Sequence, residues 1–174
     1  MERKDRLNAL EVALKNEEQE REFYLLHAER TSNPLGKAMF QEIADDELEH
    51  YNRLKKLHET WESEGRWPET VPLEVKRTKV KDVLKTMVSR AAELPPGDDD
   101  DLKAVRTAID FEARGVEFYS GLRDSIEDPI EKKFFDLLTK IENEHYLSLK
   151  ETEEFLTDPA SWYRTKERHT LDGA

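Results

Sequence analysis

Two segments of the chain carry apolar residues at every third or fourth position, the spacing that gathers them on one face of an α-helix. In the first segment, positions 40, 43, 47, 50, 54, 57 and 61 read Phe, Ile, Glu, His, Leu, Leu and Trp. In the second, positions 135, 138, 142, 145, 149, 152 and 156 read Phe, Leu, Glu, His, Leu, Thr and Leu. A Glu and a His interrupt each apolar stripe, so the pattern predicts polar side chains inside a helical core.

Glycines and prolines are few, and they divide the chain into helices. Between these breaks the sequence is rich in Glu, Lys, Leu, Ala and Arg, the residues that favour helix. It predicts four long helices and one shorter amphipathic helix, over 3–30, 35–63, 101–126, 130–157 and 79–93. The acidic run 98–101 is read as the cap of the third long helix, because carboxylates suit a helix start. The fold class predicted is all-α.

The two halves of the chain repeat one another. A shift of 95 residues aligns 9–61 with 104–156 without a gap, and 16 of the 53 aligned positions are identical. This similarity indicates a duplicated helical hairpin whose two copies are joined by a long crossover, as in some four-helix bundles. One domain over 1–174 is predicted. Its parts are hairpin one, the crossover, hairpin two and a tail, over 3–63, 64–100, 101–157 and 158–174.

Charge and composition narrow the function classes. The chain has 40 acidic and 28 basic residues and a net charge of −12. A surface this acidic repels phosphate backbones, so nucleic acid is not an expected partner. No apolar run approaches the length of a membrane span, and the absence of cysteine excludes disulfides and thiolate metal sites. We expect a soluble cytoplasmic protein with no membrane partner.

Six residues of the polar layer have matched spacing in the two halves. Each second helix carries a Glu and a His three residues apart, which places them on one face, one turn apart. Each first helix carries a Glu 30 residues before the Glu of the second. The first pair, Glu17 and Glu47, lie 13 and 12 residues from the same turn, about 20 Å along each helix. The six side chains can therefore meet in one layer, and they are Glu17, Glu47, His50, Glu112, Glu142 and His145.

Four carboxylates in a dry core are strongly unfavourable as bare charges. Either they take up protons or cations neutralise them, and two divalent cations would match their four negative charges. Oxygen and imidazole donors suit iron or manganese better than Cu(I) or a structural zinc. A bundle whose Glu and His layer has lost its metal is the alternative.

With these residues in view, the chain resembles the ferritin-like superfamily, and most closely the di-iron domain of rubrerythrins. The resemblance covers 9–61 and 104–156 and includes Glu-x-x-x-x-Glu-Phe-Tyr at 17–24 and again at 112–119. One Glu from each of two helices, with Glu-x-x-His from the other two, is the ligand set of di-iron and di-manganese carboxylate bundles. The resemblance implies a ferritin-like four-helix bundle that holds two iron ions, with manganese as the other candidate.

The resemblance also implies a role for each residue of the layer. Glu47 and Glu142 would bridge the two metals, Glu17 and Glu112 would be terminal ligands, and His50 and His145 would each bind one metal. Two tyrosines seven residues after the terminal ligands, Tyr24 and Tyr119, are read as hydrogen-bond partners of these carboxylates or as ordinary core tyrosines. The implied chemistry is the two-electron reduction of hydrogen peroxide or O2 by a diferrous site.

Two features depart from rubrerythrins. Those proteins carry a C-terminal rubredoxin domain with four iron-binding cysteines, and this sequence has no cysteine, so the electron donor is expected to be another redox protein. They also carry an additional Glu one turn after the third-helix ligand, where this sequence has Gly115. The repeat partner of that position is Glu20, which is a candidate for a further metal ligand.

Two function hypotheses follow. One is an oxidoreductase of the rubrerythrin type that counters oxidative stress by consuming hydrogen peroxide or O2 with an external electron donor. The other is an iron or manganese binding or storage protein of the ferritin-like superfamily without turnover. A homodimer is expected, because the long crossover leaves room for hairpins to exchange between protomers.

Overall fold

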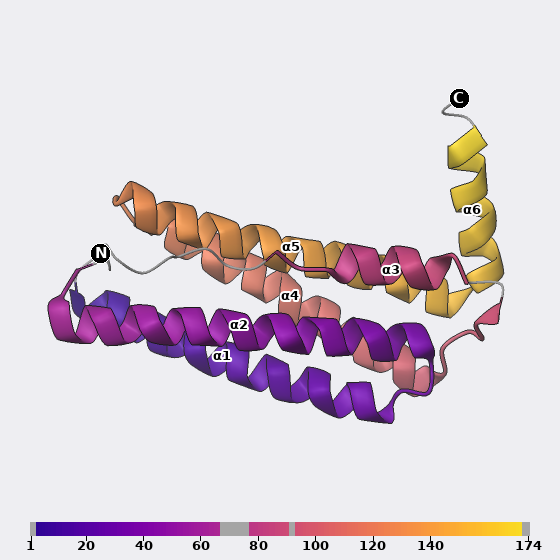
Figure 1. Cartoon of the computed structure of the whole chain (residues 1–174), viewed down its shortest axis with the longest axis horizontal. Coiled ribbons are helices and arrows are strands. Elements are labelled where there is room, and N and C mark those ends of the chain that lie inside the picture. The colour runs from indigo at the N-terminus through magenta and orange to yellow at the C-terminus, as the bar shows by residue number, and fades with distance from the viewer. Residues whose placement is uncertain (1–2, 67–76, 91–92, 172–174) are drawn as a thin grey trace.

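Four long α-helices lie side by side in a bundle (Figure 1). The computed structural model describes residues 3–66, 77–90 and 93–171. The bundle helices are α1 (Arg3–Arg30), α2 (Pro34–Glu64), α4 (Asp99–Ser125) and α5 (Pro129–Thr157). Two shorter helices, α3 (Val80–Val88) and α6 (Pro159–Leu171), complete the described residues, which contain no strand. The predicted all-α, ferritin-like bundle of two hairpins is confirmed.

The two hairpin turns are built alike. The side chain of Asn33 caps α2 by accepting hydrogen bonds from the backbone N–H groups of Leu35, at 2.9 Å, and Gly36, at 3.3 Å. Asp128 caps α5 by accepting two backbone hydrogen bonds at 2.9 Å. A proline follows each cap at the start of the helix, where its missing N–H costs no hydrogen bond. The sequence repeat is therefore also a repeat of turn geometry.

The acidic run before α4 caps that helix, as predicted. Asp98 accepts a hydrogen bond from the N–H of Asp101 at 2.8 Å, and Asp101 accepts one from the N–H of Asp98 at 3.4 Å. Asp101 is also buried, and it accepts a hydrogen bond from the hydroxyl of Thr31 in the turn of the first hairpin. This run therefore starts α4 and links the two hairpins at one end of the bundle.

Two apolar clusters fill the bundle. One includes Tyr24, Phe40, Ile43, Val105 and Leu149. The other includes Leu10, Leu54, Leu57, Tyr119 and Phe135. Along each of the four long helices, the residues of the predicted polar layer fall between members of the two clusters. Apolar side chains therefore seal the polar layer from both ends of the bundle.

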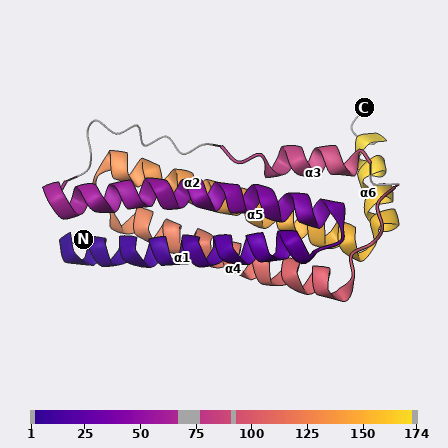
Figure 2. The ribbon, with the colours of Figure 1, turned by 60° about the horizontal axis from the view of Figure 1, so that its bottom comes forward.

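The crossover places its helix α3 over the face formed by α2 and α5 (Figure 2). Its helix α3 is shorter than the predicted 79–93, since it ends at Val88, and residues 91–92 lie outside the described residues. Val80 and Leu84 of α3 are buried in the same apolar cluster as Phe40. The amphipathic pattern of this segment thus reflects its packing onto the bundle.

No helix is predicted for the tail 158–174, but α6 begins there directly after α5. Asp158 accepts a hydrogen bond from the N–H of Ser161 at 2.9 Å, and Pro159 is the first residue of the helix. Trp162 packs edge-on against Phe155 with 5.7 Å between ring centroids. From this anchor α6 leaves the bundle at a steep angle (Figure 1). The Asp-Pro pair that marks the end of α5 therefore also starts another helix.

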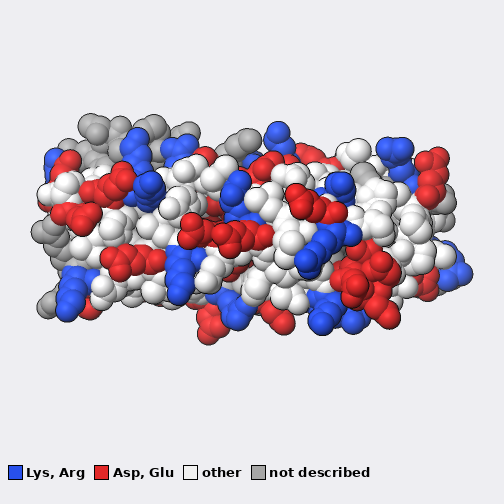
Figure 3. All heavy atoms as spheres, turned by 90° about the horizontal axis from the view of Figure 1, so that it is seen from below, with Lys and Arg blue, Asp and Glu red and all other residues white. Residues whose placement is uncertain are grey.

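Charged side chains cover the outside of the bundle. On the face shown in Figure 3, several separate groups of Asp and Glu lie with Lys and Arg between them. Among the residues that the structure describes, no helix is long and apolar enough to cross a membrane.

Candidate metal centre

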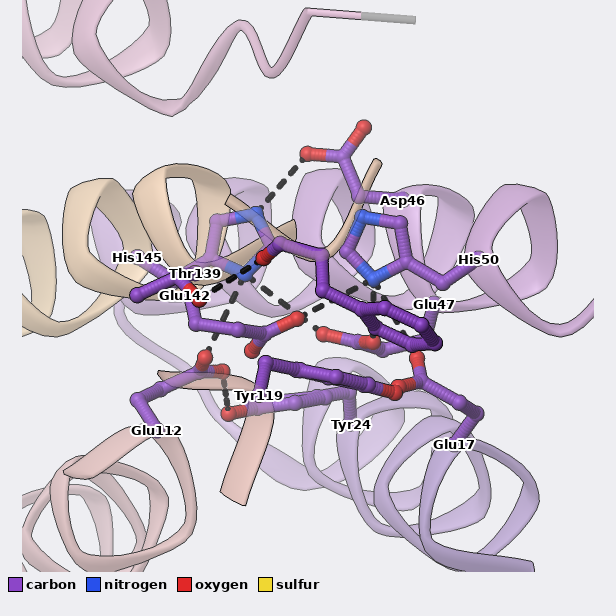
Figure 4. A network of polar contacts seen from close by, with 11 residues as sticks. Glu17, Tyr24, Asp46, Glu47, His50, Glu112, Tyr119, Thr139, Glu142 and His145 are labelled. Carbon is purple, nitrogen blue, oxygen red and sulfur yellow. Dashed lines mark hydrogen bonds and ion pairs between the residues drawn. The ribbon is translucent and has the colours of Figure 1, made fainter. Parts of the chain in front are cut away.

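Six polar side chains meet in the layer between the two apolar clusters (Figure 4). They form two groups of four: Glu17, Glu47, His50 and Glu142, and Glu47, Glu112, Glu142 and His145. In each group, one possible ligand atom from every residue lies within 4.8 Å of the others. All six side chains are at most 2% exposed. The structure thus brings together the six residues whose spacing predicts a common layer, and two of them belong to both groups.

His50 faces three carboxylates with one ring nitrogen. Its Nδ1 lies 3.0 Å from Glu47 Oε2, one turn earlier on the same helix. The same atom lies 3.2 Å from Glu17 Oε2 on α1 and 3.2 Å from Glu142 Oε1 on α5. Three of the four long helices therefore contribute to this group, which forms only when the two hairpins pack together.

His145 repeats this orientation in the second hairpin. Its Nδ1 lies 3.3 Å from Glu112 Oε2 on α4 and 3.5 Å from Glu47 Oε1 on α2. The rings of His145 and His50 stack with 6.0 Å between centroids and 24° between planes. Both imidazoles therefore present Nδ1 to the carboxylates and turn Nε2 away from them.

Two tyrosines tie the hairpins together inside this layer. Tyr24 on α1 donates a hydrogen bond to Glu112 on α4, and Tyr119 on α4 donates one to Glu17 on α1. Burial is the main cause that raises the pKa of both phenols, and the carboxylates they contact add to it. The phenols therefore stay protonated and act as donors that orient two carboxylates.

Asp46 is a buried partner of the layer that the helical stripe did not indicate. Its Oδ2 lies 3.0 Å from Nε2 of His145, and its side chain is 7% exposed. Burial raises the pKa of Asp46, but the hydrogen bond and charge of His145 outweigh burial and the net pKa is lowered. The sequence contains one indication that Asp46 is special. At the 95-residue shift it aligns with apolar Ile141, so the first half has a carboxylate where the second half has none.

Two of the carboxyls, those of Glu17 and Glu112, hold protons at neutral pH when no cation neutralises them. Burial, followed by the charge of Glu47, raises the pKa of Glu17 to about 8. Burial also raises the pKa of Glu112 well above its usual value. Glu47 differs, because its contacts with both histidines outweigh burial and lower its pKa. The layer thus contains both protonated carboxyls and an ionised one at neutral pH.

The histidines hold protons as well. Burial lowers the pKa of His50, but the charges of Glu47 and Glu17 outweigh it and raise the net pKa well above 6.5. Glu112 and the hydrogen bond with Asp46 do the same for His145. A metal ion needs neutral imidazoles and ionised carboxylates, so its binding must displace these protons.

Several buried atoms of the layer make no well-aligned hydrogen bond among the described residues, and some of them have only an ion-pair contact between a carboxylate and a histidine nitrogen. They are Glu47 Oε1, Glu112 Oε2, both carboxylate oxygens of Glu142, His50 Nε2 and His145 Nδ1. Buried polar atoms without well-aligned partners are costly, and all but His50 Nε2 belong to the inward-facing carboxylates or to an inward-facing Nδ1. Bound cations would satisfy them, so the donor set fits divalent metals that take oxygen and imidazole ligands.

Glu20, the candidate for a further ligand, belongs to neither group of four. Burial, and then the charges of nearby Glu47 and Glu112, nevertheless raise the pKa of its carboxyl to about 11. It lines a pocket of about 220 Å³ whose other lining residues come from α1 and α4. Its role as a ligand therefore stays a prediction.

Gly115, on α4, lines the same pocket as Glu20. A Cβ atom at this position would come within 3.1 Å of Glu142 Oε2, tighter than ordinary van der Waals contact. The absence of a side chain at Gly115 thus leaves room for one of the two carboxylates that both groups share.

Comparison with known proteins agrees with the geometry. The family model described as Rubrerythrin matches residues 8–153, a span that contains all six residues of the layer and both tyrosines. Searches of the curated proteins and of the solved structures give no match. The matched span covers most of the 174 residues. The chain therefore belongs to the rubrerythrin family.

Proposed function

We propose that this protein is a di-iron oxidoreductase of the rubrerythrin type, which reduces hydrogen peroxide or O2 with electrons from a separate redox protein. The observation that carries the proposal is the overlap of two ligand groups in Glu47 and Glu142. Ligands that belong to two groups at once suit two metal ions held side by side. The family of the chain supports the same function.

The layer offers a ligand set for each of two ions. Glu47 and Glu142 would contact both ions, and each ion would be completed by one pair, Glu17 with His50 or Glu112 with His145. When bound as Fe(II), two iron ions supply the two electrons that split the O–O bond of hydrogen peroxide. The four carboxylates balance the charge of two divalent ions, so the filled layer avoids unpaired buried charge.

The surrounding residues would keep the site ordered and dry. Tyr24 and Tyr119 hold Glu112 and Glu17 in place from the opposite hairpin. The apolar clusters on both sides of the layer exclude bulk water, which strengthens the electrostatic interactions inside it. Glu20 remains a predicted additional ligand at the edge of this environment.

The electron donor would be a different protein. The sequence has no cysteine, so these 174 residues cannot themselves hold the four-cysteine iron of a rubredoxin. A soluble redox protein that docks on the bundle would supply electrons one at a time. A homodimer of this chain is also proposed, with the crossover as the segment that would permit exchange of hairpins.

The test begins with metal-free protein loaded anaerobically with Fe(II) and then mixed with hydrogen peroxide or with O2. We expect two iron ions per chain, oxidation of both by the oxidant, and repeated turnover once a reductase and a redox protein are supplied. Elemental analysis of the protein as purified distinguishes iron from manganese. The rates with the two oxidants show which of them the site prefers.

Matched variants test whether metal binding and turnover need the carboxylates of the layer or only carboxylates close to it. Glu47→Gln and Glu142→Gln should lose metal binding and turnover. Glu49→Gln and Glu144→Gln, which change half-buried residues two positions further along each helix, should retain both. Fewer than one iron per chain after loading would overturn the metal site. Iron that oxidises once and then consumes no further oxidant with the donor present would contradict an oxidoreductase and favour storage.

A further inference from the structure

The two histidines of the layer differ at the ring nitrogen that faces away from it. Nε2 of His145 lies 3.0 Å from Oδ2 of buried Asp46. Nε2 of His50 is buried too, but it has no hydrogen-bond partner in the part of the chain that the structure describes. Figure 4 shows Asp46 on the outer side of the rings, with its only dashed line drawn to His145. The two ligand sets repeat one another, but only His145 has a hydrogen-bond partner at the ring nitrogen that faces away from the layer.

The difference originates in the sequence and in the topology. The repeat partner of Asp46 is Ile141, which belongs to an apolar cluster and cannot accept a hydrogen bond. Asp46 is itself held by a hydrogen bond from Thr78, in the crossover just before α3. In the part of the chain that the structure describes, no equivalent segment follows the second hairpin, because α5 is followed by α6, which leaves the bundle (Figure 1).

Once His145 has lost its extra proton, as metal binding requires, Asp46 determines which ring nitrogen carries the remaining hydrogen. Because a carboxylate accepts, Nε2 of His145 donates to it and Nδ1 keeps its lone pair for the side of Glu112 and Glu47. His50 must likewise carry a hydrogen on Nε2 whenever its Nδ1 binds a metal. That N–H is buried without an acceptor among the described residues, which makes the binding form of His50 less favourable.

We propose that the two metal positions are unequal and fill in order: the position at His145 and Glu112 binds a divalent ion first and more tightly, and the position at His50 and Glu17 fills second. This inference rests on the proposed metal site. Partners that orient a ligand histidine typically change metal affinity by roughly 10- to 100-fold. At limiting metal the chain would therefore hold one ion, at His145, and would lack the second ion that two-electron chemistry requires.

The test is an anaerobic titration of the metal-free full-length chain with Co(II), followed by calorimetry and by visible absorption. Wild type should show two steps whose affinities differ by roughly 10- to 100-fold. Asp46→Asn keeps the shape of the side chain and removes its charge, so it should weaken the tight step by a similar factor and leave the weak step unchanged. Asp45→Asn removes the same charge at an exposed neighbour and should leave both steps unchanged.

Two histidine variants assign the steps. His50→Ala should retain the tight step and lose the weak one, whereas His145→Ala should lose the tight step. Equal steps in wild type, a uniform effect of Asp46→Asn on both steps, or loss of the tight step in His50→Ala would each overturn the ordering. Thermal unfolding of the metal-free variants checks that each is folded.

The ordering and the proposed function can fail separately. If the two steps are equal but the iron-loaded protein still reduces peroxide with a donor, only the ordering is wrong. If neither Co(II) nor Fe(II) binds, the metal site is wrong, and the ordering falls with it. If the steps are ordered but no oxidant is turned over, the ordering stands and the oxidoreductase function is wrong.

Discussion

The phenol of Tyr24 on α1 donates a hydrogen bond to the carboxylate of Glu112 on α4 and so joins the two hairpins inside the polar layer. Tyr119 returns the contact by donating to Glu17 on α1. Each hairpin thus orients a carboxylate of the other hairpin. A single hairpin contributes three residues to one ligand group and only one to the other, and it lacks the tyrosine that would hold its own carboxylate. The layer is therefore a property of the assembled bundle.

Loss of this contact should destabilise the metal-free protein. Tyr24→Phe leaves the buried carboxyl of Glu112 without its donor, which should lower the free energy of unfolding by about 1 to 3 kcal/mol. Tyr119→Phe should have an effect of the same size on account of the repeat. Denaturant unfolding measures both, with Tyr51→Phe as the control at a half-buried tyrosine of α2. An effect of Tyr24→Phe no larger than that of the control would contradict the role of the contact.

Bound metal should stabilise the fold through Glu142. Its Oε2 has no hydrogen-bond partner among the described residues, and its Oε1 contacts Nδ1 of His50 at 3.2 Å, although Glu142 belongs to both ligand groups. With Co(II) at about 100 times the dissociation constant, wild type should gain about 2.7 kcal/mol per site. Glu142→Gln should lose this gain. Glu144→Gln changes a carboxylate that pairs with Lys81 outside the layer, and should keep it. Thermal unfolding with and without metal distinguishes the two variants.

The sequence predicts the layer well because helical spacing and the repeat can both be recognised from residue positions along the chain alone. Glu47 and His50 lie three residues apart in a stripe that is otherwise mostly apolar, and the second half repeats the pattern at Glu142 and His145. Such a pattern predicts burial on one face whatever the details of packing. All six residues of the layer lie where the spacing places them.

Other features depend on packing that spacing does not determine. Asp46 lies one position away from the stripe, and its contact with His145 depends on how α2 is rotated against α5. Which ring nitrogen of each histidine faces the carboxylates is set by side-chain rotation and has no sequence signal. The helix after Pro159 was missed because an Asp-Pro pair is as compatible with a chain break as with a new helix cap.

Metal affinity should rise with pH. Glu17 has its ordinary pKa of 4.5 when unfolded and a pKa of about 8 in the folded layer, so it holds a proton at neutral pH that a metal must displace. Below pH 8 the proton on Glu17 should make the affinity increase by up to roughly tenfold per pH unit, and this contribution should level off above pH 8. Co(II) titrations in buffers on both sides of pH 8 measure the slope. Affinity that is flat or falls as pH rises would show that these protons are not displaced.

The same proton on Glu17 makes the stability of the metal-free protein depend on pH. Because the folded pKa of Glu17 is raised, its contribution to stability is fully present below about pH 4.5 and is lost as pH rises through about 8. The metal-free protein should therefore lose stability from this group over the range in which the metal-bound protein gains affinity. The stabilisation by Co(II), measured by thermal unfolding, should accordingly be larger at pH 8 than at pH 6.

Two glycines on α4 offer a matched pair for testing the space around Glu142. In a helix, Gly→Ala ordinarily stabilises by about 1 kcal/mol, and Gly121→Ala should show this gain because nothing lies within 4 Å of the new Cβ. Gly115→Ala puts a Cβ 3.1 Å from Glu142 Oε2, so the carboxylate must move by a few tenths of an ångström. We expect a smaller gain in stability and a metal affinity weakened by roughly tenfold. Equal stability gains and wild-type Co(II) affinity in both variants would show that Gly115 is not needed to position Glu142.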